Sequence, residues 1–125
     1  MIQKIGIVIP SYNETLNIKI LARKIFELLP EAKVLIVDDS SQKESEKLKT
    51  MLKSYCNLGK VRIISRQKKL GRGSAVVIGL TELLKNKDIQ YFFEMDADLA
   101  HDPKDFNKFL KAMESTEADV VFGSR

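Results

Sequence analysis

Short, largely apolar runs recur along the chain and predict strands. Five of them, rich in β-branched or aromatic residues, cover residues 4–10, 33–37, 61–64, 91–95 and 118–122. Turn-forming or acidic residues follow most of these runs, as expected where strands end. The runs show little alternation of apolar and polar residues, which is typical of strands that are buried on both faces of a sheet.

Apolar residues at helical spacing occupy the segments between these runs. The four stripes are Leu21, Ile25, Leu28 and Leu29; Leu48, Leu52 and Tyr55; Ala75, Ile78, Leu83 and Leu84; and Phe106, Phe109, Leu110 and Met113. Pro30 ends the first stripe, Gly71 to Gly73 open the third, and Asp102-Pro103 opens the fourth with a capping acid and a first-turn proline. Each stripe predicts one helix.

The alternation of strands and helices predicts an α/β fold. The connections have the length that right-handed crossovers need, so a largely parallel sheet covered by helices on both faces satisfies the pattern. A chain of 125 residues suits one domain with its own core. We therefore expect a single three-layer domain over residues 1–125, without linkers or internal repeats.

Composition narrows the class of protein further. The chain is 44% hydrophobic and 30% charged, and it has no apolar run long enough to span a membrane or to serve as a leader. Cys56 is the single cysteine, which excludes an internal disulfide and favours a reducing compartment. We expect a soluble chain in the cytoplasm.

The net charge of +4 is unevenly distributed. Residues 43–73 hold ten Lys and Arg against two acids, whereas residues 74–125 hold six against ten. The basic segment is either a set of solvated helix faces or a rim around an anion site. Tyr55 is its only aromatic residue, so a nucleic-acid surface with interleaved stacking residues is disfavoured.

Polar clusters follow every predicted strand. They lie at residues 11–14, 38–41, 66–73, 96–98 and 124–125. In open α/β sheets, ligands bind outside the carboxyl ends of the strands. Each cluster has a local explanation as a turn or a cap, but five at one edge of a sheet predict a binding site.

Asp96-Ala97-Asp98 is the most informative of these clusters. Residues i and i+2 of an extended segment project to the same side, so both carboxylates can face one point. Hard cations such as Mg²⁺ or Mn²⁺ bind through a few carboxylate oxygens and complete their shell with water and phosphate. The alternative is an ordinary polar turn, in which Asp bonds to its own backbone.

Five ordered motifs carry a family resemblance over the whole chain. They are Ile9-Pro10-Ser11-Tyr12-Asn13-Glu14, Val37-Asp38-Asp39-Ser40-Ser41, Leu70-Gly71-Arg72-Gly73-Ser74-Ala75, Met95-Asp96-Ala97-Asp98-Leu99 and Gly123-Ser124-Arg125. Together they resemble the family-two inverting glycosyltransferases of GT-A fold, and within these the polyprenol-phosphate (dolichol-phosphate) mannosyltransferases. Members of that family continue well beyond the Gly-Ser-Arg motif, so the resemblance implies the donor-binding half of a longer enzyme.

The resemblance also implies roles for individual residues. A nucleotide pocket would be lined by Pro10, Tyr12, Glu14, Val37 and Asp39, with Asp39 near the base or ribose. Asp96 and Asp98 would be the catalytic, metal-binding pair that holds Mn²⁺ or Mg²⁺ and the diphosphate, and Ala97 would touch the sugar nucleotide through its backbone. Arg125 would contact phosphate or the donor sugar.

Some of these residues have alternative interpretations. Asp39 would equally serve as a helix cap, and Arg125 as a surface residue. Arg66 and Arg72 are expected as secondary phosphate contacts, because they flank a glycine-rich helix start. At Ala100 many relatives carry Gln or Ser, and Gln there can complete the metal shell, so water or diphosphate would substitute here.

The implied activity is transfer of a hexose, with inversion, from a nucleotide diphosphate sugar to a polyprenyl phosphate. GDP-mannose is favoured as donor and UDP-glucose is the second choice, and the acceptor would bind through the C-terminal part of the enzyme at the cytoplasmic membrane face. One alternative is a non-catalytic nucleotide-binding fragment, and another is a related UDP-sugar transferase with a different acceptor. A phosphorylation-controlled receiver domain ranks last, because its acid pair should follow the first strand.

Overall fold

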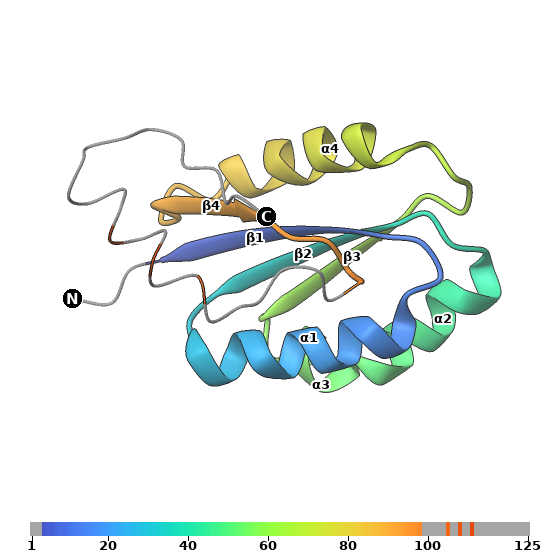
Figure 1. Cartoon of the computed structure of the whole chain (residues 1–125), viewed down its shortest axis with the longest axis horizontal. Coiled ribbons are helices and arrows are strands. Elements are labelled where there is room, and N and C mark those ends of the chain that lie inside the picture. The colour runs from blue at the N-terminus through green and yellow to red at the C-terminus, as the bar shows by residue number, and fades with distance from the viewer. Residues whose placement is uncertain (1–3, 99–104, 106–107, 109–110, 112–125) are drawn as a thin grey trace.

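In the part of the chain that the structure describes, the sheet has four parallel strands in the order β3-β2-β1-β4 (Figure 1). The computed structural model describes residues 4–98, 105, 108 and 111. Within this range the strands are β1 (Ile5–Ser11), β2 (Lys33–Asp38), β3 (Val61–Ser65) and β4 (Tyr91–Glu94). The four strands predicted in this part of the chain are confirmed, and the fifth, over residues 118–122, lies outside the described residues.

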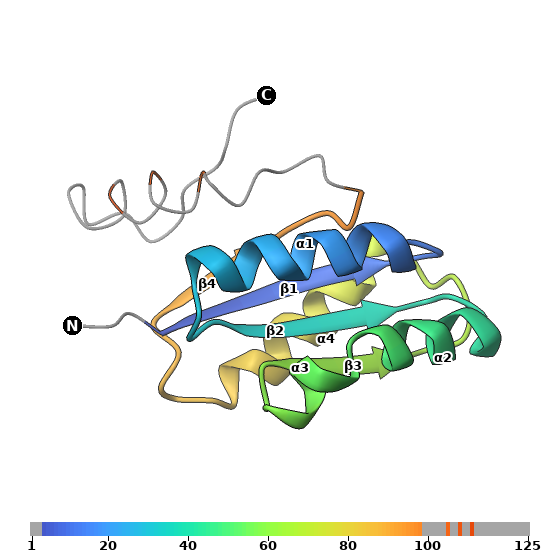
Figure 2. The same ribbon diagram turned by 90° about the horizontal axis from the view of Figure 1, so that it is seen from below.

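Helices cover both faces of the sheet, as Figures 1 and 2 show. Helices α1 (Thr15–Leu28), α2 (Gln42–Met51) and α3 (Lys53–Asn57) lie on one face, and α4 (Arg72–Leu84) lies on the other. The predicted three-layer α/β fold is therefore confirmed. None of the helices in the described ranges combines the length and hydropathy that a membrane crossing requires.

The prediction of a single helix around Leu48, Leu52 and Tyr55 is wrong in one respect, because this segment forms two helices, α2 and α3. The chain turns at Leu52, where φ is −102° and ψ is 10°. Leu52 is fully buried at this turn, and Tyr55 beyond it packs on Phe26 of α1 with ring centroids 4.9 Å apart. Both side chains therefore remain against the core across the turn. The helix predicted after Asp102 lies outside the described residues apart from Asp105, Lys108 and Lys111.

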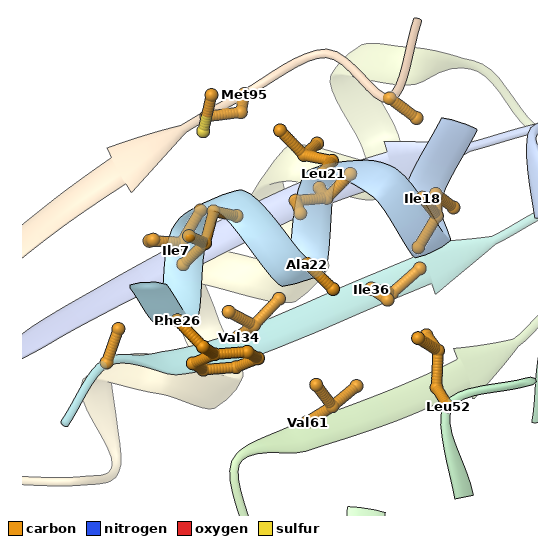
Figure 3. Packing of buried hydrophobic residues seen from close by; sticks show 14 of the residues in the cluster. Ile7, Ile18, Leu21, Ala22, Phe26, Val34, Ile36, Leu52, Val61 and Met95 are labelled. Carbon is orange, nitrogen blue, oxygen red and sulfur yellow. The ribbon is translucent and has the colours of Figure 1, made fainter. Parts of the chain in front are cut away.

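The larger part of the core lies between α1, α2 and the sheet (Figure 3). Ile7 and Ile9 of β1 pack in this cluster, whereas Val8 between them packs in a smaller cluster on the α4 side. This alternation follows from the two-residue period of a strand. β1 is thus buried on both faces, which explains its continuous apolar sequence.

Helix α4 lies unusually close to β1 at Gly79. A Cβ atom built on Gly79 would lie 2.5 Å from Cγ1 of Val8, a side chain with no exposed surface. Only glycine allows the helix to approach the strand so closely. The position of α4, and with it the position of the helix start, therefore depends on this contact.

Candidate functional site

Backbone hydrogen bonds tie together the loops that follow the strands. The Asp39 amide donates to the Ser11 carbonyl at 2.9 Å, and the Arg66 amide donates to the Asp38 carbonyl at 2.9 Å. The Asn13 amide donates to Oγ of Ser40 at 2.7 Å, with Asn13 in the left-handed region at a φ of 55°. Asn tolerates this conformation better than most residues. The carboxyl ends of β1, β2 and β3 thus form one connected edge.

A pocket of about 390 Å³ opens at this edge. Its lining residues are Pro10, Ser11, Tyr12, Glu14, Asp39, Lys69, Gly71, Arg72, Ala75, Asp96, Ala97 and Asp98. The sequence motifs after β1, β2 and β4 and the start of α4 therefore converge, as the positions of the motifs predicted.

Seven of the nine predicted site residues line this pocket. They are Pro10, Tyr12, Glu14, Asp39, Asp96, Ala97 and Asp98. Val37 does not join them, because its side chain is fully buried in the sheet and it is absent from the lining. Arg125 and Ala100 lie outside the described residues.

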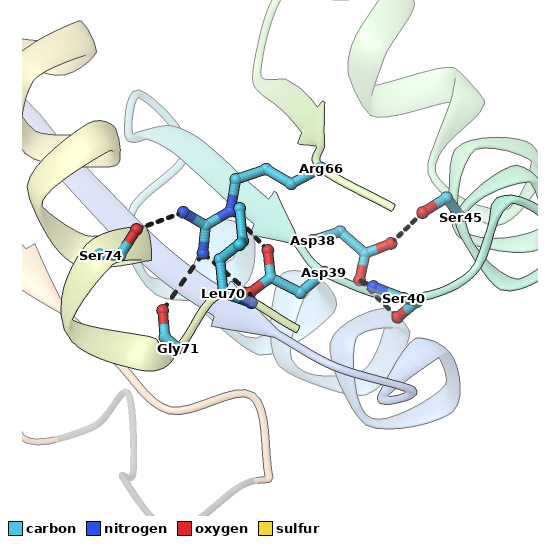
Figure 4. A network of polar contacts seen from close by, with 8 residues as sticks. All are labelled: Asp38, Asp39, Ser40, Ser45, Arg66, Leu70, Gly71 and Ser74. Atoms are coloured by element: carbon cyan, nitrogen blue, oxygen red, sulfur yellow. Dashed lines mark hydrogen bonds and ion pairs between the residues drawn. The ribbon is translucent and has the colours of Figure 1, made fainter. Parts of the chain in front are cut away.

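Asp39 forms a buried ion pair with Arg66 (Figure 4). Nε of Arg66 lies 2.5 Å from Oδ1 and Nη2 lies 2.8 Å from Oδ2, and the two side chains are 8% and 7% exposed. The Leu70 amide donates to Oδ2 at 3.1 Å. A carboxylate has about four acceptor positions, so three donors leave about one for a ligand in the pocket.

Arg66 also fixes the loop that leads into α4. Its guanidinium donates to Oγ of Ser74 at 2.5 Å and to the Gly71 carbonyl at 3.2 Å (Figure 4). Arg66 was expected as a phosphate contact, but its side chain is buried against Asp39 and it is absent from the lining of the pocket. It connects the end of β2 to the start of α4.

Asp38 has a different environment from its neighbour Asp39. Its carboxylate accepts hydrogen bonds from Oγ of Ser40 at 2.7 Å and from Oγ of Ser45 at 2.5 Å. Asp38 is 1% exposed. Ser41, not Asp39, caps α2, through an Oγ that accepts from the Glu44 amide at 3.5 Å. Asp39 is therefore the acid of this pair that faces the pocket.

Tyr12 and Lys69 form the outer part of the pocket. Tyr12 is 46% exposed, and Nζ of Lys69 lies 5.0 Å from the centre of its ring. Lys69 was not predicted as a site residue. The basic run at 66–72 was its only signal, and the sequence does not distinguish it from the adjacent Lys68.

Arg72 lies at the first position of α4 and pairs with acids of β4 and the loop beyond. Its Nε and Nη2 both lie 2.8 Å from Oδ1 of Asp96, and Nη2 also contacts Oε1 of Glu94. Gly71 precedes it with a φ of 99°, a conformation that favours glycine. Arg72 was expected to contact phosphate, and in this structure it contacts carboxylates.

The carboxylates suit a metal ion that is shared with a ligand. Among the residues that the structure describes, no group of three or more His, Cys, Asp or Glu could hold a metal. Asp96 and Asp98 line one pocket, and two carboxylates are what Mg²⁺ or Mn²⁺ uses when phosphate and water complete the shell. The donor set fits such an ion and does not fit a closed structural site.

Ser11 contributes a buried hydroxyl to the lining of the pocket. Ser11 is 7% exposed and lines the pocket, and its buried Oγ has no hydrogen-bond partner within the described part of the chain. A buried hydroxyl without a partner costs about 1–3 kcal/mol. A polar group of a ligand in the pocket would remove that cost.

Comparisons with known proteins identify relatives of this chain. The family described as "Glycosyl transferase family 2" matches residues 6–125. Polyprenol monophosphomannose synthase of Mycolicibacterium smegmatis is 30% identical over 98% of this chain and 45% of its own length. Dolichol-phosphate mannosyltransferase of Pyrococcus furiosus is 34% identical over 98% of this chain and 33% of its own length. The chain thus spans half or less of these relatives.

Two solved structures share the fold. The mannosyltransferase PcManGT from Pyrobaculum calidifontis, in complex with GDP-Man and Mn²⁺, superimposes with a TM-score of 0.58 at 18% identity, over 75% of this chain and 27% of that chain. A crystal structure of S. aureus TarS gives a TM-score of 0.65 at 17% identity, over 94% of this chain and 21% of that chain. The GT-A-like arrangement expected from the sequence motifs is confirmed.

Proposed function

The chain belongs to glycosyl transferase family 2, and from that premise we propose that its strand-end pocket binds a nucleotide diphosphate sugar. The complete enzyme would transfer a hexose, with mannose favoured, to a polyprenyl phosphate with inversion. The observation that carries the proposal is the pocket itself, in which an aromatic face, two cationic side chains and the Asp96 and Asp98 carboxylates line one space. The names of the two mannosyl-transferring relatives, and the GDP-Man and Mn²⁺ in PcManGT, support mannose.

Each part of the donor has a matching part of the pocket. Tyr12 offers a half-exposed ring on which a base can pack, and Asp39 keeps an acceptor position for a base or ribose donor. Lys69 and the start of α4 suit the diphosphate, since helix N-termini attract anions. The contacts of Ala97 and of Arg125 with the donor remain part of the proposal.

Asp96 and Asp98 are the residues that would hold Mn²⁺ or Mg²⁺. When bound, such an ion neutralises charge on the departing diphosphate. An acceptor phosphate oxygen forms the new bond to the anomeric carbon while the bond to the diphosphate breaks on the opposite face, which inverts the configuration. An acceptor of this class would place the complete enzyme at the cytoplasmic face of a membrane.

Thermal-shift titration tests the donor site directly. We expect GDP or GDP-mannose with Mn²⁺, at about 100 times its dissociation constant, to add about 2.7 kcal/mol of stability, which is roughly 10 °C in Tm for a chain of this size. UDP and UDP-glucose are the comparison ligands. A preference for UDP would change the assigned donor from GDP-mannose to a UDP-hexose. Absence of any nucleotide binding would contradict the proposal.

Substitution of Asp98 by alanine should remove the part of this shift that depends on Mn²⁺. Asp88→Ala is the matched control, because Asp88 is an exposed acid that pairs with Lys4 and is absent from the pocket lining. An unchanged Mn²⁺-dependent shift in Asp98→Ala would show that the ion binds elsewhere. An assay of sugar transfer to a polyprenyl phosphate, in which the released nucleoside diphosphate is measured, then distinguishes an enzyme from a nucleotide-binding fragment.

A further inference from the structure

The guanidinium of Arg72 occupies a cation position on Asp96, a carboxylate of the pocket. Two of its nitrogens lie 2.8 Å from the same oxygen, Oδ1 of Asp96, and one of them also contacts Glu94. The side chain of Arg72 is 52% exposed, whereas that of Asp96 is 21% exposed. The pair is thus accessible from the pocket that both residues line.

The position of Arg72 in α4 favours a pairing with an acid. A positive side chain in the first turn of a helix is disfavoured by the partial positive charge of the helix N-terminus, and the first turn of α4 contains no acid. Asp96 and Glu94 are the counter-charges in this structure. A diphosphate at the same helix start would provide an alternative counter-charge.

We propose that Arg72 is an internal counterion that neutralises Asp96 in the empty pocket, is displaced from it by the divalent cation, and then pairs with the diphosphate of the donor. The proposal rests on the proposed function, because it requires a cation and a nucleotide diphosphate at this pocket. A guanidinium and a metal ion at close range to Oδ1 of Asp96 repel each other, so each weakens the binding of the other. When the cation binds Asp96, Arg72 loses its counter-charge, and the diphosphate supplies a new one. Cation and diphosphate therefore bind cooperatively.

The chain offers a matched control for this arginine. Arg62 is also an exposed arginine, with a side chain 64% exposed, and it pairs with Glu82 of α4 at 3.0 Å. Hydrogen bonds from Lys85 and Arg62 lower the pKa of Glu82. Arg62 and Glu82 are both absent from the lining of the strand-end pocket. Arg62→Met and Arg72→Met change the net charge equally, but only Arg72→Met removes a cation from Asp96.

Mn²⁺ titration monitored by electron paramagnetic resonance of the free ion tests the proposal without an activity assay. In the absence of nucleotide, we expect Arg72→Met to bind Mn²⁺ about tenfold more tightly than the parent chain, because a competing charge has been removed. Arg62→Met should differ from the parent by less than about twofold. GDP binding at saturating Mn²⁺ should change in the opposite direction, weakening about tenfold in Arg72→Met and less in Arg72→Lys.

Opposite effects on the two ligands are the signature of the proposed exchange. Unchanged Mn²⁺ affinity in Arg72→Met, or an equal increase in Arg62→Met, would overturn it. The variant Asp96→Asn distinguishes failure of this proposal from failure of the proposed function. If Asp96→Asn abolishes Mn²⁺ binding in the presence of GDP, the metal site is supported and only the role of Arg72 is rejected. If the parent chain binds no Mn²⁺ even with GDP, both fall. Melting curves of each variant confirm that the half-exposed substitutions leave the chain folded.

Discussion

Replacement of Arg66 by methionine is expected to destabilise the chain by about 3–5 kcal/mol, the cost of leaving one partner of a buried ion pair without its counter-charge. Asp39 would keep only the Leu70 amide of its three donors, in a site where its side chain is 7% exposed. The loop from Arg66 to Ser74 would also lose two of its attachments, at Gly71 and Ser74. Since native domains are stable by about 5–15 kcal/mol, the loss is a large fraction of the total.

Urea unfolding of Arg66→Met and of Arg62→Met measures this difference. Arg62 forms an exposed pair with Glu82, for which a cost of about 0–1 kcal/mol is expected. The double variant Arg66→Met with Asp39→Leu removes both charges and should recover part of the loss, because well-packed apolar residues replace buried ion pairs at little cost. A loss below about 1 kcal/mol in Arg66→Met would show that the pair is not buried in solution.

The fold was predictable because its signals are local. Each strand is a short apolar run, since both faces of the sheet are covered, and the carboxyl ends of parallel strands necessarily meet at one edge. The end of the second predicted helix was not predictable in this way. Leu52 satisfies the helical stripe whether or not the chain turns there, and the turn is evident only from the backbone angles of Leu52 in the structure.

The site was predictable as a place, but its charge pairs were not. Arg66 and Asp39 are 27 residues apart, and Arg72 and Asp96 are 24 apart. Which acid each arginine meets depends on the path of the loop after β3, where Gln67 has a φ of 60°. No sequence pattern specifies that path, so both arginines were assigned to phosphate.

The basic segment at 43–73 divides into a solvated helix and a part that reaches the pocket. Lys43, Lys47 and Lys49 are exposed on α2, as solvated helix faces are. Lys69 and Arg72 line the pocket, and Arg66 lies buried behind it. The charge excess therefore reflects a solvated helix in its first part and the chemistry of the strand-end edge in its second.

Substitution of Gly79 by alanine is expected to destabilise the chain by roughly 3 kcal/mol, at the upper end of the cost of overpacking. The new methyl group would lie 2.5 Å from Cγ1 of Val8 and 3.0 Å from its Cγ2. Val8 is fully buried and β-branched, so it has no free rotamer into which it can move. Helix α4 would have to shift away from β1, and this cost exceeds the gain of about 1 kcal/mol in helix propensity.

Gly73→Ala separates the clash from the propensity effect within the same helix. A Cβ atom on Gly73 meets nothing within 4 Å, so urea unfolding should show a gain of about 0.5–1 kcal/mol for this variant. Val8→Ala combined with Gly79→Ala should cost less than the sum of the two single changes, because the smaller strand residue makes room for the methyl group. Additive losses would contradict a direct contact. Since Arg72 begins the same helix, a shift of α4 in Gly79→Ala should also weaken GDP binding, which links the approach of α4 to β1 at Gly79 to the geometry of the pocket.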